Sequence, residues 1–145
     1  MSVWDLLQNR LFDSVVLSLE SVGWDVGTLG VADRELIALW RAETTITCTG
    51  FLSYLGKWGL GCCCIAITAL EDIGAPIRAE VLRSMLNIAG PHLNRVGVES
   101  YIDILLSLSE TDRLRLRRLD EAFGLCSEPL ARLIVEHYGA AKFAH

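Results

Sequence analysis

Hydrophobic residues recur at three- and four-residue steps over most of the chain, and glycines or prolines separate the repeats. This spacing is typical of amphipathic helices. In residues 2–21 the apolar stripe consists of Trp4, Leu7, Leu11, Val15 and Leu19. Arg10 is the one basic residue in that segment, whereas a helix on a membrane surface is rich in Lys and Arg. We therefore expect residues 2–21 to form a helix that packs against the rest of the protein.

A second helix is predicted from Asp33 to about Thr47, after a glycine-rich loop. Asp33 can cap its first turn, because a side-chain oxygen at that position accepts a hydrogen bond from a free backbone N–H. Residues 44–47 are β-branched, and a short strand is the alternative for this end of the helix. No second strand-like segment is present to pair with it, so the pattern favours helix.

The longest nearly uncharged run, residues 44–70, lies at the centre of the predicted fold, with Lys57 as its one charged residue. We expect a short helix over residues 51–55, a glycine-rich turn, and a buried helix over residues 62–73 that ends at Gly74. A membrane hairpin is the alternative for this run. Glycines divide it, however, and Lys57 at mid-depth in a bilayer would cost about 3 kcal/mol. We therefore interpret residues 62–73 as the central helix of a soluble core.

The second half of the chain contains four further predicted helices. In chain order they cover residues 76–88, 98–108, about 113–124 and about 130–139. Gly90-Pro91 should stop the first of them, and the tail after Gly139 should fray. The residues expected to be buried are Ile77, Val81, Met85, Ile88, Ile102, Leu105, Leu106 or Leu108, Leu130, Leu133, Ile134 and His137. The arginines of residues 113–118 have acidic neighbours, which indicates a solvated face rather than a phosphate site.

Together these elements predict one all-α domain over residues 1–145, a bundle of seven or eight helices around the helix at 62–73. A chain of 145 residues is long enough to bury one substantial core. The composition is 52% hydrophobic, which is rich for a soluble domain and suggests that a partner or a second copy covers some apolar surface. A homodimer is the simplest such arrangement.

The net charge of −5 is confined to the first half of the chain. Residues 1–72 carry nine acids and four bases, a balance of −5, whereas residues 73–145 carry nine of each. Direct binding of nucleic acid needs a clustered basic face, so this distribution argues against it. It favours a basic protein partner instead. The candidate partner-binding residues are Asp25, Asp33, Glu35, Glu43, Glu71 and Asp72.

The five cysteines are Cys48, Cys62, Cys63, Cys64 and Cys126. Their odd number, with no signal peptide before them, predicts free thiols in a reducing cytoplasm. Neighbouring side chains on a helix point about 100° apart, so the three adjacent cysteines cannot bind one metal together. We expect no metal and no cofactor. The enzymatic alternative is a Cys48 nucleophile with His92, in a predicted loop, or His137 as its base.

Residues 43–76 resemble a bacterial family of small helical proteins whose best-known member is a DNA-mimic protein. The residues that carry the resemblance are Glu43, Gly50-Phe51, Tyr54, Gly59 and Ala69–Ala75. Residues 119–123 and the last helix resemble the C-terminal part of that family, so the likeness covers about residues 33–137. It implies an all-helical and often dimeric fold, and function through binding of another protein.

The chain departs from the family pattern at residues 47–49, where the family usually has two asparagines and a glycine, and at Ser53 and Lys57. Its 18 acids are offset by 13 bases, which is less negative than a faithful imitation of DNA requires. We therefore predict a non-enzymatic protein that binds and inhibits or regulates a partner, as a DNA-mimic-like regulator or as the immunity partner of a toxin. A cysteine-dependent enzyme and a membrane-associated protein held by residues 44–70 are the alternatives.

Overall fold

A computed structural model describes residues 1–93 and 101–143 of the chain. Over these ranges the structure has seven α-helices, one 3₁₀ turn and no strand, which confirms the predicted all-α class. The elements are α1 Val3–Ser21, η1 Val26–Thr28, α2 Val31–Thr49, α3 Phe51–Asp72, α4 Pro76–Leu93, α5 Tyr101–Ser107, α6 Glu110–Leu125 and α7 Leu130–Phe143.

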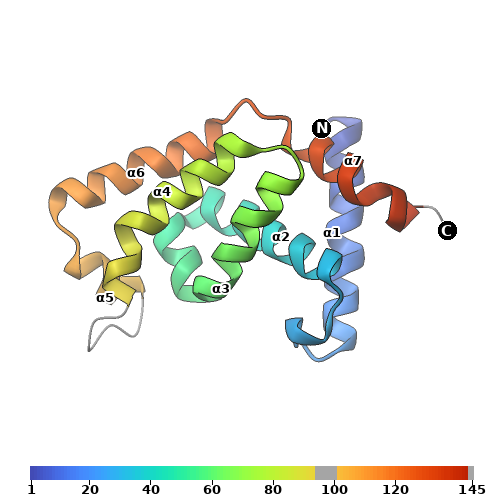
Figure 1. Cartoon of the computed structure of the whole chain (residues 1–145), viewed down its shortest axis with the longest axis horizontal. Coiled ribbons are helices and arrows are strands. Elements are labelled where there is room, and N and C mark those ends of the chain that lie inside the picture. The colour runs from blue at the N-terminus through green and yellow to red at the C-terminus, as the bar shows by residue number, and fades with distance from the viewer. Residues whose placement is uncertain (94–100, 144–145) are drawn as a thin grey trace.

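The helices α2 and α3 pack closely against each other and form the middle of the molecule (Figure 1). At one end α1 lies beside α7 and also contacts α2, while at the other end α5 packs on α3 and α4, and α6 packs on α4 and α2 (Figure 1). One continuous hydrophobic core joins the two ends, from Leu11 of α1 through Leu70 of α3 to Leu116 of α6. Helices α1, α4, α5 and α6 therefore each pack in part on α2 or α3.

The N-terminal helix forms as predicted. Ser2 caps α1, and its hydroxyl accepts a hydrogen bond from the backbone N–H of Asp5, whose carboxylate accepts one from the backbone N–H of Ser2. Leu11, Val15 and Leu19 of the predicted stripe are fully buried. The amphipathic pattern thus identified the helix and most of the face that packs inward, but Trp4 of the predicted stripe is 38% exposed.

The start of α2 differs from the prediction, whereas its end confirms the predicted helix. Gly30 occupies the N-cap position, and Asp33 lies inside the first turn, where its charge complements the helix dipole. The helix continues to Thr49, so a strand at residues 44–47 is wrong. Thr44 and Thr49 donate their hydroxyls to backbone carbonyls one turn back, at 2.7 and 3.0 Å, which accommodates these β-branched residues in a helix.

The predicted central helix is confirmed as the second part of α3. A kink at Gly59, with φ 86° and ψ 174°, separates it from the shorter first part. Cys63 and Ala66 are fully buried, and the helix ends before Gly74, whose φ of 89° allows the N–H of Ala75 to bond the carbonyl of Leu70. Within the described ranges α3 is the one helix long and apolar enough to span a membrane, and 33% of that apolar window is buried.

The end of α4 extends further than predicted. The helix continues through Gly90 and Pro91 to Leu93, although proline usually ends a helix. His92 therefore lies in the last helical turn and not in a loop. It is buried, and its Nδ1 lies 2.9 Å from the Ser107 hydroxyl. This contact ties the last turn of α4 to α5, which explains why the helix persists past the proline.

The start of α4 buries a different face from the one predicted. Ile77 is 56% exposed, whereas Arg78 is 6% exposed; Met85 and Ile88 are buried as predicted. The cause is Glu128, whose carboxylate accepts hydrogen bonds from the backbone N–H groups of Ile77 and Arg78 at 2.9 and 2.8 Å. These bonds fix the orientation of the first turn of α4, so that the Arg78 side chain points inward.

The side chains of α5 also differ from the predicted pattern. The first residues of the predicted helix, 98–100, lie outside the described residues. The predicted core residues that are exposed are Ile102, Leu105 and Leu106. Ile104 is buried instead, and of the two alternatives Leu106 and Leu108 it is Leu108 that is buried. A helix of seven residues has too few turns for its periodicity alone to identify the buried face.

The last helix is longer than predicted and differs at one side chain. It continues past Gly139 to Phe143, so the predicted fraying directly after Gly139 is wrong. His137 is exposed, whereas its neighbour Tyr138 is buried. The reason is a contact with α2, because the Tyr138 hydroxyl donates a hydrogen bond to Glu35 at 2.6 Å.

Candidate functional site

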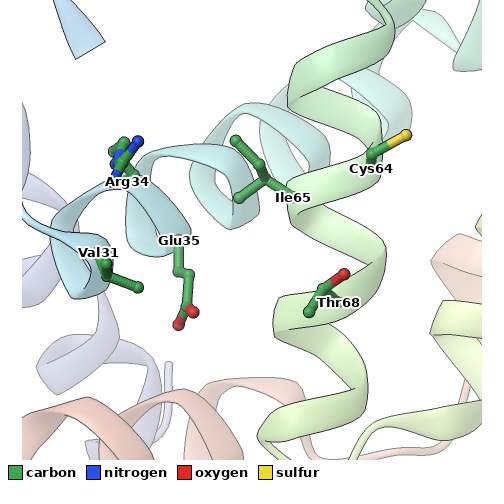
Figure 2. A pocket seen from close by; sticks show the side chains of 6 residues that line it. All are labelled: Val31, Arg34, Glu35, Cys64, Ile65 and Thr68. Atoms are coloured by element: carbon green, nitrogen blue, oxygen red, sulfur yellow. The ribbon is translucent and has the colours of Figure 1, made fainter. Parts of the chain in front are cut away.

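A pocket of about 310 Å³ lies between the first turns of α2 and the second part of α3. Its lining residues are Val31, Arg34, Glu35, Cys64, Ile65 and Thr68. Figure 2 shows Val31, Ile65 and Thr68 directed toward the space between the two helices. The Glu35 carboxylate points along the opening, and the Arg34 side chain points in a different direction (Figure 2). The walls are therefore mostly apolar, with one carboxylate facing the space.

Helical spacing explains why these residues meet. Val31 and Glu35 are four positions apart on α2, as Cys64 and Thr68 are on α3, so each pair lies on one face of its helix. The pocket is thus a direct product of two helix faces that pack against each other.

Tyr138 connects this pocket to α7. Its hydroxyl donates a hydrogen bond to Oε2 of Glu35 at 2.6 Å. Burial, followed by the hydrogen bond to Glu35 and the nearby charge of Asp72, raises the pKa of the Tyr138 phenol above its ordinary value. The phenol therefore remains a hydrogen-bond donor at neutral pH, between carboxylates supplied by α2 and α3.

Of the six predicted partner-binding residues, Glu35 accepts the hydrogen bond of Tyr138, and Asp72 is near enough for its charge to act on the same phenol. Asp25 accepts a hydrogen bond from the backbone N–H of Gly27 and so caps η1. Asp33 is partly buried in the first turn of α2. Of the six predicted residues, Glu35 is the one that lines the pocket.

The other two predicted residues have partners within the molecule. Glu71 forms an ion pair with Arg83 of α4. Glu43 is partly buried, and burial raises the pKa of its carboxyl group, while the charge of Arg78 acts in the opposite direction. Arg78 in turn donates a hydrogen bond from its guanidinium to the carbonyl of Glu128 at 2.8 Å. Glu43 and Arg78 thus belong to the junction of α2, α4 and the segment before α7.

The groups of the enzymatic alternative do not meet in the described part of the chain. Cys48 is exposed at the end of α2, and no hydrogen bond joins it to His92 or His137 there. The Ser107 hydroxyl lies 2.8 Å from the carbonyl of Ile104 and 2.9 Å from Nδ1 of His92. These contacts fix α5 against the last turn of α4.

The cysteines are free thiols at all five positions. Burial raises the pKa of Cys63 to about 12, and burial also raises the pKa of Cys62, whose sulfur accepts a hydrogen bond from the Tyr54 hydroxyl. Both groups are therefore protonated at neutral pH. Over residues 1–93 and 101–143, no three His, Cys, Asp or Glu side chains gather as a metal site would require.

Sequence reasoning missed the contact between two separate motif segments. The carboxylate of Asp120 in α6 accepts a hydrogen bond from the backbone N–H of Phe51 at 2.9 Å and so caps α3. A Cβ added to Gly50 would lie 3.0 Å from Oδ2 of Asp120. Both Gly50-Phe51 and the segment at 119–123 carried the family resemblance. Correlated substitutions at these two segments in related sequences could have revealed their contact.

The fold defines a small all-α protein organised around the Gly50-Phe51 junction of α2 and α3. The sequence pattern of the DMP19-like protein family matches residues 28–141, which is well over half of the chain. The chain therefore belongs to the DMP19-like family, a family of DNA-mimic proteins, and the resemblance noted for residues 33–137 is confirmed. No curated protein and no solved structure matches the chain.

Proposed function

We propose that this protein is a non-enzymatic, DNA-mimic-like regulator that binds a basic protein and inhibits or regulates it. The observation that carries the proposal is membership of the DMP19-like family over residues 28–141. A protein that imitates DNA presents carboxylates where a DNA-binding partner expects phosphates. Such a regulator occludes the partner's nucleic-acid surface. The immunity partner of a basic toxin would use the same chemistry.

The placement of charge supports a basic partner. Residues 1–72 hold nine acids and four bases, and these residues form α1, η1, α2 and α3. Asp13, Glu20 and Asp25 are exposed along α1 and the turn after it, and Asp72 is exposed at the end of α3. Complementary charge at such positions increases the rate of encounter more than it increases affinity. Association kinetics are therefore the appropriate measurement.

The test begins with affinity capture of the partner from the native host and its identification by mass spectrometry. Association is then measured at low and high salt for the parent protein and for a variant with Asp25→Ser and Asp72→Lys. Serine keeps a capping oxygen at position 25, and lysine at the last turn of α3 suits the helix dipole, so both changes preserve the fold. The matched control is Glu121→Lys on exposed α6.

We expect the double variant to associate about tenfold more slowly than the parent at low salt, with a smaller difference at high salt. The control should retain the parental rate. Equal rates for the parent and the double variant at low salt would show that this acidic surface does not contact the partner.

A membrane-associated role is the second candidate, because α3 has the length and apolar composition of a membrane span. We propose a cytoplasmic location instead, since the exposed Lys57 and the kink at Gly59 interrupt the apolar run. Fractionation of the native host by high-speed centrifugation separates the two. Recovery in the membrane pellet, with release by detergent but not by salt, would contradict the cytoplasmic proposal.

A further inference from the structure

We propose that the pocket between α2 and α3 receives one lysine or arginine side chain of the partner protein, with the Glu35 carboxylate as the bound counter-ion. This inference rests on the proposed function, since it specifies where a basic partner would be recognised. It makes Glu35 a specific contact, in addition to the general negative charge of residues 1–72.

The geometry of Glu35 suits this role. One carboxylate oxygen, Oε2, accepts the hydrogen bond of Tyr138 at 2.6 Å, and this is the one side-chain partner of Glu35 among the described residues. An ionised carboxylate has about four acceptor sites, so most of its capacity remains open. Tyr138 is thus a positioning residue that holds the carboxylate at the pocket.

The walls suit the aliphatic part of a long basic side chain. Val31 and Ile65 contribute apolar surface on opposite sides of the space, and the methylene groups of Lys or Arg pack well on such surface (Figure 2). The volume of about 310 Å³ is at the lower end of the range of about 300–1,000 Å³ for small-molecule pockets. A single side chain therefore matches the pocket better than a cofactor-sized ligand does.

The local charges favour a cation. Asp72 lies one helical turn beyond Thr68 on α3, and its charge acts on Tyr138 together with that of Glu35. Arg34 is the basic residue of the lining, and its side chain points in a different direction from the Glu35 carboxylate (Figure 2). An ammonium or guanidinium group in the pocket would thus meet the Glu35 carboxylate directly and the charge of Asp72 at longer range.

The experiment uses nuclear magnetic resonance of the full chain with N-acetyl-lysine methylamide as the probe and N-acetyl-norleucine methylamide as its uncharged counterpart. We expect the lysine probe to shift the signals of Val31, Ile65 and Thr68. The Glu35→Gln variant, which keeps an acceptor for Tyr138, should bind the probe about tenfold more weakly. The control is Glu71→Gln, which removes an acid already paired with Arg83 and should leave binding unchanged.

The outcomes separate the pocket from the proposed function. If the norleucine probe shifts the same signals equally, or if Glu35→Gln binds the lysine probe as well as the parent does, the pocket does not recognise a cation. If Asp72→Lys slows association with the captured partner but Glu35→Gln leaves its affinity unchanged, the function stands and this inference fails. If the pocket binds the lysine probe but no charge change affects the partner, the proposed function fails instead.

Discussion

Gly50 is the residue that joins α2 to α3, and no other residue type suits its position. Its φ of 93° lies in a region that residues with a side chain avoid, and a Cβ there would lie 3.0 Å from Asp120. The same carboxylate caps α3 through the N–H of Phe51 at 2.9 Å. Backbone conformation and capping therefore depend on the same few atoms.

We expect Gly50→Ala to lower the free energy of unfolding by about 2 kcal/mol, from the strained φ and the displaced Asp120 carboxylate. The matched control is Gly61→Ala, where a Cβ meets nothing within 4 Å. That helical position should become more stable by up to about 1 kcal/mol. Urea unfolding of the two variants, followed by circular dichroism, checks both values. Equal stability of both variants would contradict the role given to Gly50.

Glu43 gives the folded state a pH dependence. Burial raises the pKa of its carboxyl group, more than the charge of Arg78 lowers it. The folded state therefore binds this proton more readily than the unfolded state, and ionisation of Glu43 at neutral pH lowers stability.

We expect Glu43→Gln to raise the free energy of unfolding at pH 7, because burial penalises the ionised form of the parental carboxyl group. The gain should shrink as the pH falls through the raised pKa toward the ordinary value of 4.5, because the parental group is then protonated. Asp120 titrates in both the parent and the variant, so the difference between their free energies of unfolding reports on Glu43 alone. Urea unfolding at pH 7 and pH 5 measures it. A less stable Gln variant at pH 7 would mean that the ionised pair with Arg78 stabilises the fold.

At the scale of elements, distant acids cap two helix starts that have no local capping side chain. Asp120 caps α3, and Glu128 caps α4 by accepting two backbone N–H groups, those of Ile77 and Arg78. Residue 128 lies some fifty positions beyond the helix it caps. The caps therefore act as tertiary contacts that hold α6 and the start of α7 in place.

We expect Glu128→Ala to destabilise the protein by about 2 kcal/mol, because the backbone N–H groups of Ile77 and Arg78 lose their carboxylate acceptor. Glu136→Ala is the control, since it removes only the exposed ion pair with Arg132, which is worth at most about 1 kcal/mol. Thermal and urea unfolding of both variants check the difference. A loss at Glu128 no larger than that at Glu136 would show that the cap is dispensable.

Helical periodicity was sufficient to predict the fold class and the central helix, because each long helix has an apolar face that its sequence displays. It failed where a contact from far along the chain decides the outcome. His92 is buried because it hydrogen-bonds to Ser107 of α5. Tyr138 is buried in place of the predicted His137 because its hydroxyl donates a hydrogen bond to Glu35 of α2. Single-sequence spacing contains no information on such pairs.

The candidate site shows the same division. The charge pattern named Glu35 and Asp72; Glu35 accepts the hydrogen bond of Tyr138, and the charge of Asp72 acts on the same phenol. The same pattern also named Glu43, which is partly buried near Arg78, because composition cannot tell an exposed acid from one that the fold covers. The pocket could not be predicted, because it forms only where α2 packs on α3. Nothing in the sequence marks Ile65 as one of its lining residues.

For the whole molecule, α1 is the element that the family match leaves out, since the match begins at residue 28. Its inner face packs on α7 and α2. Its outer face has Val3, Leu6 and Leu17 exposed by 69%, 53% and 65%. These residues and Arg10 and Asp13 follow the spacing of three and four that forms one stripe along a helix. The stripe is too apolar for a face that meets only water.

We predict that this stripe pairs with the same stripe of a second copy, in an antiparallel arrangement. A two-fold axis that sets Leu6 against Leu17 of the second copy also sets Arg10 against its Asp13, and symmetry repeats both pairs.

Leu17→Glu should therefore raise the dimer dissociation constant at least about tenfold, by placing a charge in an apolar contact. The control is Leu125→Glu, at a leucine that is 84% exposed on α6. Analytical ultracentrifugation over a range of concentrations measures both. A parent protein that stays monomeric at high concentration, or a Leu125→Glu variant that dissociates as readily as Leu17→Glu, would remove α1 as the dimer interface.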